Sequence, residues 1–330
     1  LSISRIKSEI KQATNEQLPN LFSVDFKVNK FLALNMENEN RSVVDLLRAS
    51  LHTSNPKFIP LNPIMDEVLS SLVGTPFVAV SSTSLHFMGQ KHFAYDFKQN
   101  HFSYKKCRNY SDLKNSSFCR IGNDIFALSG EEADGTYSVK CEKYNIVQDT
   151  WTTIAPLSKP YYRGAACGFV DSNGAVKVAV FGGFEKDSNS LNQSMSVYDL
   201  TTDIWVETNV KHSVQFDLLS PTLPLLYCKS GDLCLVNLID DNVQLNFISP
   251  KTGKMRTKAK PYPKEDIERP YIESSCLLGG KINLIISEKV HPFLEKKQAS
   301  PMQKSSLVFS ITIQANWELQ IPHRHDIVYE

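Results

Sequence analysis

The sequence predicts an all-β fold assembled from repeated four-stranded sheets, and two observations carry this prediction. The first is residues 161–209, which contain four short strand-like runs at 164–170, 176–181, 195–200 and 204–208. One such sheet cannot bury both of its faces and therefore needs neighbours of its own kind. The second is a pair of large apolar residues, mostly aromatic, that recurs along the chain at intervals of roughly 50 residues.

The recurring pair divides the chain into six units. Its members are Tyr198 with Trp205, Tyr144 with Trp151, Tyr95 with Phe102, Phe309 with Trp317, and more weakly Phe247 with Met255 and Val44 with Leu51. Six units of roughly 50 residues use nearly all of a 330-residue chain, and 42% hydrophobic residues supply a core for each. The sequence therefore predicts one domain of six similar sheets.

The fourth unit carries the most specific motif. Phe181-Gly182-Gly183 ends an apolar strand, Tyr198-Asp199 follows, and Trp205 lies six residues after the aspartate. This pattern resembles the kelch repeat. Elsewhere the match is partial, because Leu128-Ser129-Gly130 and Met88-Gly89 keep one glycine each and residues 212–262 keep neither. The chain is similar to a divergent member of the kelch family, which implies a six-bladed β-propeller of four-stranded antiparallel blades.

Three segments are expected along the chain. Residues 1–19 predict a short amphipathic helix ended by Pro19, either the end of an upstream coiled coil or helical domain that oligomerises, or a helix packed beneath the propeller. Residues 20–322 form the propeller, with blades expected at 21–46, 77–104, 117–154, 164–208, 216–255 and 271–319. Pro56 and Pro60 are expected to break the chain before the second blade. Residues 323–330 form a tail that either closes the ring as a strand beside the first blade or docks loosely.

The composition argues against nucleic acid or a membrane as a partner. The formal net charge is +1, whereas nucleic-acid-binding domains carry a clustered basic surface. The basic stretch 251–264 is an exception, expected to be a solvated strand-and-loop face, with a polyanion site as the alternative. The chain contains no run of eighteen apolar residues, which would predict membrane insertion. Its first twenty residues lack a signal-peptide hydrophobic region. Seven cysteines without CxxC spacing favour a cytoplasmic location.

The sequence contains no assembled catalytic or metal-binding pattern, so we expect neither an enzyme nor a cofactor. Tyr227-Cys228 and His212 resemble parts of the copper site of galactose-oxidase-like propellers, but no second pair of histidines falls at matching loop positions. His323 and His325 offer a metal two ligands, where a catalytic zinc needs three. The Glu, Asp and His spacing of iron-dependent kelch specifier proteins is absent, as are a GxSxG elbow and a phosphate loop.

The family resemblance implies a binding surface at one end of the central channel. In kelch propellers that bind peptides, residues just before the first strand of each blade and the loops between second and third strands line that end. The matching positions are Tyr162, Arg163, Gln215, Arg269 and Tyr271 for the first kind, and Glu131, Glu132, Phe184 and Glu185 for the second. Arginine and tyrosine anchor interfaces because they combine large contact area with directional donors. Arg163 is the most specific candidate, because Gly164 lets the backbone enter the narrow inner part of the blade.

We therefore expect a non-catalytic protein–protein interaction module or scaffold that binds a protein partner through these loops. Two roles stay open. One is a structural component of a cytoskeletal, ciliary or other large assembly. The other is the substrate receptor of a ubiquitin ligase, which requires an upstream BTB or related adaptor domain. A galactose-oxidase-like or other propeller enzyme is the third alternative.

Overall fold

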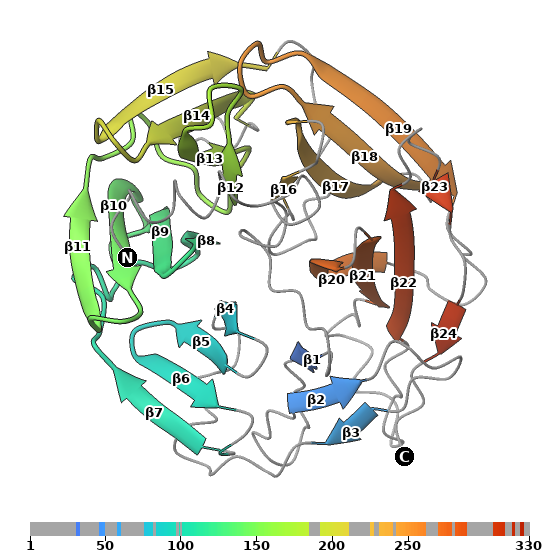
Figure 1. Cartoon of the computed structure of the whole chain (residues 1–330), viewed down its shortest axis with the longest axis horizontal. Helices are drawn as coiled ribbons and strands as arrows, with labels where there is room; N and C mark the ends of the chain where they lie inside the picture. The colour runs from blue at the N-terminus through green and yellow to red at the C-terminus, as the bar shows by residue number, and fades with distance from the viewer. Residues whose placement is uncertain are drawn as a thin grey trace.

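The structure is a computed structural model, and it is an all-β assembly of antiparallel sheets. It describes residues 76–81, 84–96, 99, 101–184, 192–210, 225–227, 231–239, 242–261, 270–278, 281–288 and 306–313, with five short strands at 31–33, 46–49, 58–60, 319–320 and 324–326. The described strands form six separate sheets that follow one another around a ring (Figure 1). The arrangement is propeller-like, as the sequence predicts.

Four of the six sheets have four strands each, paired in chain order. The second sheet comprises β4 (Phe77–Ser81), β5 (Ser84–Met88), β6 (His92–Asp96) and β7 (His101–Lys105), and the third β8 (Ser117–Ile121), β9 (Asp124–Glu131), β10 (Tyr137–Asn145) and β11 (Thr150–Ile154). The fourth comprises β12 (Ala165–Val170), β13 (Val176–Phe181), β14 (Ser194–Asp199) and β15 (Ile204–Asn209), and the fifth β16 (Leu225–Tyr227), β17 (Leu233–Ile239), β18 (Asn242–Ile248) and β19 (Met255–Pro261). In each, the first strand lies nearest the centre of the ring and the fourth lies outermost (Figure 1).

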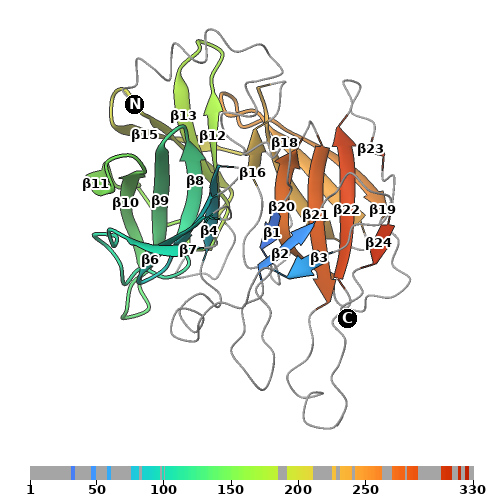
Figure 2. The same cartoon turned by 60° about the horizontal axis from the view of Figure 1, so that its bottom comes forward.

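The first and last sheets depart from four strands. The first has three, β1 (Phe31–Ala33), β2 (Leu46–Ala49) and β3 (Phe58–Pro60), and the sixth has β20 (Pro270–Leu278), β21 (Lys281–Glu288), β22 (Ser306–Ile313), β23 (Leu319–Gln320) and β24 (Arg324–Asp326). Both β23 and β24 pair with β22. The two sheets stand side by side in the ring (Figure 2).

Two features of the terminal sheets differ from the sequence expectation. The first blade was expected to end at residue 46, but β3 extends the sheet to Pro60. A proline is compatible with this position, because Pro60 is the last residue of an edge strand. The tail supplies β24, and its partner is β22 of the last sheet rather than a strand of the first. The expected helix at 1–19 lies outside the described residues.

In the second, third and fourth sheets, the two members of each aromatic pair lie directly opposite each other on the third and fourth strands. Ring centroids lie 4.5 Å apart for Tyr95 and Phe102, 5.1 Å for Tyr144 and Trp151, and 5.0 Å for Tyr198 and Trp205. Such cross-strand pairs are the unit of sheet stabilisation. They explain why the pair recurs once per sheet.

The weaker pair of the fifth unit, Phe247 and Met255, is not directly opposite across the strands. Phe247 lies opposite Arg256, and Met255 lies opposite Ile248. Residues that face each other across the β18–β19 hairpin are an odd number of positions apart along the chain. Phe247 and Met255 are an even number apart, so they cannot face each other in this register. Trp317, the expected partner of Phe309, lies outside the described residues.

A polar contact joins the third sheet to the fourth. The Asp203 Oδ1 accepts hydrogen bonds from the Tyr198 hydroxyl at 2.7 Å and from the Ala155 amide at 2.9 Å. The Trp205 Nε1 donates to the Ala155 carbonyl at 2.8 Å. Ala155 directly follows β11. Side chains of the fourth sheet therefore bind both the amide and the carbonyl of the residue at the end of the third sheet.

The same contact joins the second sheet to the third. The Asp149 Oδ1 accepts from the Tyr144 hydroxyl at 2.7 Å and from the Lys106 amide at 2.9 Å, while the Trp151 Nε1 donates to the Lys106 carbonyl at 2.8 Å. Both aspartates have a left-handed backbone conformation, with φ of 51° for Asp149 and 57° for Asp203. Aspartate tolerates this conformation better than most residues. We call this repeated arrangement the Tyr–Asp–Trp clamp.

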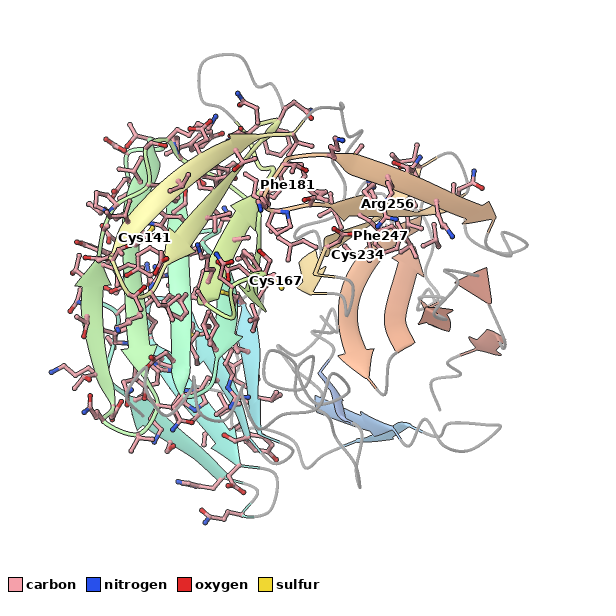
Figure 3. All side chains as sticks on the ribbon, turned by 45° about the horizontal axis from the view of Figure 1, so that its top comes forward. Cys141, Cys167, Phe181, Cys234, Phe247 and Arg256 are labelled. Atoms are coloured by element: carbon pink, nitrogen blue, oxygen red, sulfur yellow. The ribbon has the colours of Figure 1, made fainter. Side chains whose placement is uncertain are left out.

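Apolar cores fill the space between neighbouring sheets. Trp205 packs against a core that draws Phe126 and Leu128 from the third sheet and Val178 and Tyr198 from the fourth. Trp205 therefore packs between two adjacent sheets. A second core joins the fourth and fifth sheets and contains Cys167, Phe181, Leu233 and Ile248 among others (Figure 3).

Candidate functional site

The double glycine of the fourth sheet brings two predicted site segments together. Gly183 has φ of +79°, and a Cβ on it would lie 2.5 Å from the Tyr162 carbonyl oxygen, so no other residue fits without a shift. Phe184 then donates its amide to that same carbonyl at 3.0 Å. The segment that follows the second strand therefore contacts the segment that precedes the first.

The third sheet is built the same way. Lys114 and Glu131 exchange two backbone hydrogen bonds, at 2.9 and 2.8 Å. Gly130 sits beside this contact with φ of +132°, and a Cβ there would lie 2.8 Å from the Lys114 carbonyl oxygen. Because β8 and β12 pack side by side, the two contacts lie at the same end of neighbouring sheets.

Tyr162 is the centre of a side-chain group at this end, which we call the Tyr162 cluster: Asn115, Glu131, Tyr137, Tyr162, Arg163 and Phe184. The rings of Tyr137 and Tyr162 stack with centroids 4.3 Å apart and planes 7° apart, and the Phe184 ring lies 6.4 Å from Tyr162. The Asn115 Nδ2 donates to the Tyr162 hydroxyl at 3.2 Å and to the Glu131 Oε2 at 3.3 Å. Partial burial raises the pKa of Tyr162.

Arg163 lies beside these rings in an unusual backbone conformation. Its φ is 56°, and its guanidinium carbon is 5.4 Å from the centroid of the Tyr162 ring. The Nε atom is buried and has no hydrogen-bond partner within the described part of the chain. No carboxylate among the described residues lies within ion-pair distance of Arg163. An intramolecular salt bridge, the structural alternative for this residue, is therefore not found in that part.

Four of the nine predicted site residues belong to the cluster: Glu131, Tyr162, Arg163 and Phe184. Glu132 does not, because its carboxylate pairs with the Lys140 Nζ at 2.9 Å in the β9–β10 hairpin. Gln215, Glu185 and Arg269 lie outside the described residues. Tyr271 is described only as a backbone position of β20, opposite Ser287.

Sequence reasoning missed Asn115 and Tyr137. Asn115 lies two residues before β8, as Arg163 lies two residues before β12, and the two share the left-handed conformation, with φ of 54° and 56°. Applying the rule for the start of a blade to the third sheet would have selected Asn115. Tyr137 is the first residue of β10 and therefore lies beyond the loop residues, Glu131 and Glu132, that the loop-based rule selected.

Comparisons with known proteins do not assign the chain to a family. No protein-family model matches the chain, and no curated protein matches it. One solved structure that it resembles is that of YjhT, which is 13% identical over 74% of this chain and 81% of that chain, with a TM-score of 0.48.

The described ranges contain neither a metal-binding group nor a membrane-spanning helix. No group of three or more histidine, cysteine, aspartate or glutamate side chains there has an arrangement that could hold a metal ion. No helix in those ranges is long and apolar enough to cross a membrane.

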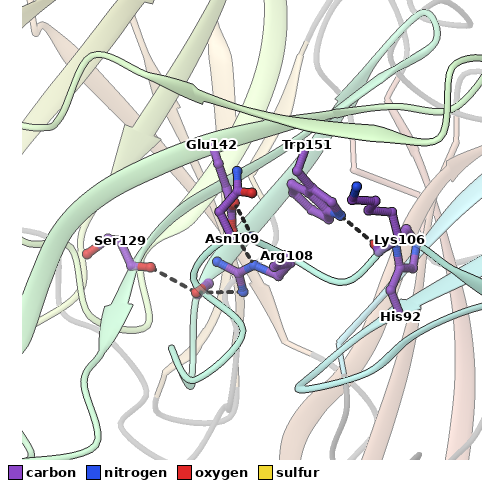
Figure 4. Close-up of polar contacts among 8 residues, drawn as sticks. His92, Lys106, Arg108, Asn109, Ser129, Glu142 and Trp151 are labelled. Carbon is purple, nitrogen blue, oxygen red and sulfur yellow. Dashed lines mark hydrogen bonds and ion pairs between the residues drawn. The ribbon is translucent and has the colours of Figure 1, made fainter.

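A buried ion pair supports the loop that carries Asn115 (Figure 4). The Arg108 Nε donates to the Glu142 Oε1 at 2.7 Å, and the Asn109 amide donates to the Glu142 Oε2 at 3.0 Å. The Arg108 Nη1 donates to the Ser116 Oγ at 3.2 Å, and that hydroxyl donates to the Ser129 carbonyl at 2.8 Å. This network ties the start of the loop to β10 and its end to β9.

A buried histidine pair lies near the same loop. The His86 Nδ1 and the His92 Nε2 are 2.9 Å apart, and the His92 Nδ1 is 3.1 Å from the Lys106 carbonyl oxygen. A carbonyl only accepts, so the His92 Nδ1 carries a proton and its Nε2 accepts from His86. Burial, with a smaller contribution from nearby Lys105, lowers the pKa of His86 to about 3 and that of His92 to about 4. Both rings are therefore neutral near pH 7.

Stability should fall as the pH is lowered from about 6.5, the ordinary histidine pKa. Between that value and the lowered pKa values the unfolded chain binds more protons than the folded chain, so acid favours unfolding by about 1.4 kcal/mol per pH unit for each histidine. Urea unfolding at pH 7.5, 6.0 and 5.0 measures this slope. The variant His92→Gln should have a shallower slope, whereas His101→Gln, at an exposed position of β7, should keep the wild-type slope. Equal slopes for wild type and His92→Gln would contradict the assignment.

Proposed function

We propose that the chain is a kelch-type, six-bladed β-propeller that acts as a non-catalytic interaction module, and that the Tyr162 cluster is part of its partner-binding surface. The observation that carries the proposal is Arg163, a cation whose Nε has no partner in the described part of the chain and which lies beside a stacked tyrosine pair. The described ranges contain no metal-binding group that would favour a metal-dependent reaction instead.

The chemistry of the cluster fits a protein ligand that combines an apolar side chain with a carboxylate. Tyr137, Tyr162 and Phe184 offer adjacent partly exposed rings, and tyrosine and arginine recur as interface anchors. The Arg163 guanidinium would bind the carboxylate through two parallel hydrogen bonds, a geometry that lysine cannot reproduce. In this proposal the partner is a protein of a cytoskeletal or other large cytoplasmic assembly.

The variant Arg163→Lys tests the proposal. It keeps the charge and removes the planar fork, so we expect partner binding to fall about tenfold, the loss of roughly 1.4 kcal/mol, with an unchanged melting temperature. The measurement is quantitative affinity purification with the wild-type chain, Arg163→Lys and Arg163→Ala, followed by titration of each recovered protein. Lys251→Gln, an exposed residue in the β18–β19 turn at the opposite end of the sheets, is the matched control.

The outcomes separate the alternatives. Equal affinity with lysine or alanine at position 163 would remove Arg163 from the surface. Loss of binding together with a lowered melting temperature would mean that Arg163 supports the fold instead. Recovery of ubiquitin-ligase subunits among the Arg163-dependent proteins would favour the substrate-receptor role over a structural one.

A further inference from the structure

The outermost strand of the fifth sheet, β19, is an exposed basic edge. It pairs with β18, and the sheet order ends with it. Lys254, Arg256, Thr257, Lys258 and Ala259 are all exposed, and the Arg256 side chain keeps 63% of its surface accessible although it pairs with Asp232. Figures 1 and 3 show β19 on the perimeter of the ring, with Arg256 on it. Both faces of this strand are therefore open to solvent over several residues.

Two basic residues of β19, Arg256 and Lys258, share one face. Arg256 lies opposite Phe247, and Lys258 lies opposite Leu245. Alternate residues of a strand project to the same side and are about 6.8 Å apart. These two cations consequently have the spacing of alternate residues in an extended polypeptide strand.

The register also shows which backbone groups face the open edge. The Ser249 amide donates to the Lys254 carbonyl at 2.9 Å, which makes these two residues a hydrogen-bonded pair of the β18–β19 hairpin. Hydrogen-bonded and non-hydrogen-bonded pairs alternate along an antiparallel ladder, so Arg256, Lys258 and Lys260 direct their backbone groups to β18. Thr257 and Ala259 direct theirs outward. The 2.8 Å contact between the Thr257 Oγ1 and the Asn246 Oδ1 fits a closely spaced, non-hydrogen-bonded pair.

We propose that β19 receives an acidic, extended peptide segment of a partner protein as an added strand. The incoming backbone would bond to the outward N–H and C=O groups of Thr257 and Ala259. Its residues opposite Arg256 and Lys258 would then form non-hydrogen-bonded pairs, with Cα atoms about 4.5 Å apart and side chains on one face. Aspartate or glutamate at alternate positions of the segment meets the cations in this register.

Two other occupants fit the edge less well. A second copy of β19 would bring like charges opposite each other, which is destabilising. A nucleic acid would satisfy the cations, but its phosphates only accept hydrogen bonds and leave the outward C=O groups of β19 without donors. The outer strand of the fourth sheet, β15, exposes Ile204 and Val206 at alternate positions instead of cations. The outer strand of the fourth sheet therefore does not share the preference for an acidic segment.

Synthetic peptides test the proposal directly on the full chain. The probe is a nine-residue peptide of alternating glutamate and threonine, titrated by fluorescence anisotropy. Three comparison probes are the lysine–threonine peptide, the glutamate–threonine peptide with N-methylated backbone amides, and a single-stranded oligonucleotide. We expect at least tenfold weaker binding of all three, and weaker binding of the acidic peptide at higher salt.

Two variants separate charge from backbone pairing. Lys258→Gln should weaken peptide binding about tenfold, whereas the control Lys251→Gln, which makes the same change in charge outside the strand, should have a much smaller effect. Ala259→Pro removes one outward N–H and keeps the bonds to β18, a position where an edge strand accepts proline. It should also weaken binding about tenfold, with an unchanged melting temperature.

Each contrary outcome overturns the proposal. Wild-type affinity in Ala259→Pro, with loss only in Lys258→Gln, would make β19 a polyanion-binding surface without strand addition. Tighter binding of the oligonucleotide than of the peptide would assign the edge to nucleic acid. Absence of binding to any probe would leave the lysines with the single role of preventing edge-to-edge aggregation.

Discussion

Replacement of Glu142 by alanine should lower the free energy of unfolding by about 3–5 kcal/mol, because it leaves a buried guanidinium without its counter-ion. The side chains of Arg108 and Glu142 are 1% and 0% exposed. One nitrogen of Arg108, Nη2, already lacks a partner in the described part of the chain, and Asn109 would lose its acceptor as well. Urea unfolding followed by circular dichroism measures the loss.

Two controls show whether the stranded charge is the cause. The pair of Lys159 and Glu207 is more exposed, at 28% and 35%, so Glu207→Ala should cost less than about 1 kcal/mol. The double variant Arg108→Met, Glu142→Leu removes both charges and should be more stable than Glu142→Ala alone. If the free energy of unfolding of Glu142→Ala were within about 1 kcal/mol of the wild-type value, the burial of this pair would be contradicted.

The variant Trp205→Ala should also lower the free energy of unfolding, by about 3–5 kcal/mol. The indole contacts the core between the third and fourth sheets and donates to the Ala155 carbonyl, so alanine leaves both a cavity and an unpaired acceptor. Thermal and urea unfolding of the purified chain measure the effect. An unchanged melting temperature would mean that Trp205 is a surface contact residue instead.

Phenylalanine at position 205 divides the effect into its parts. It keeps an aromatic ring opposite Tyr198 and removes the indole N–H, so the expected loss is about 1 kcal/mol. The natural sequence contains this exchange, because Phe102 occupies the equivalent position opposite Tyr95 in the second sheet. A loss in Trp205→Phe as large as in Trp205→Ala would assign most of the stabilisation to the clamp.

The strands of the second to fourth sheets could be predicted from the sequence because local patterns determine them. Tyr198 and Trp205 mark the turn between third and fourth strands, and their spacing fits a direct cross-strand pair. The register of the fifth sheet could not be read from Phe247 and Met255, because their spacing does not fit a direct cross-strand pair and a hydrophobic pattern alone does not give the register. The strand β3 was missed because Pro60 was taken as a break, although an edge strand tolerates it.

The candidate site was predictable in its position but not in its contacts. Arg163 and Phe184 follow from their places relative to the strands, since the start of a first strand and the end of a second lie at one end of a sheet. The stacking of Tyr137 on Tyr162 depends on how two neighbouring sheets meet, which no single repeat encodes. The pairing of Glu132 with Lys140 likewise depends on the twist of the β9–β10 hairpin.

The Tyr–Asp–Trp clamp bonds only to main-chain atoms of the neighbouring sheet. The backbone amides of Lys106 and Ala155 can therefore be used to measure separation of adjacent sheets. Their side chains are free to differ, as lysine and alanine do, because Asp149 and Asp203 bind an amide and the two indoles bind a carbonyl. The amide protons of these residues can exchange with deuterium only when adjacent sheets separate. The exchange rate of Lys106 therefore measures how often the second and third sheets separate, and that of Ala155 how often the third and fourth sheets separate.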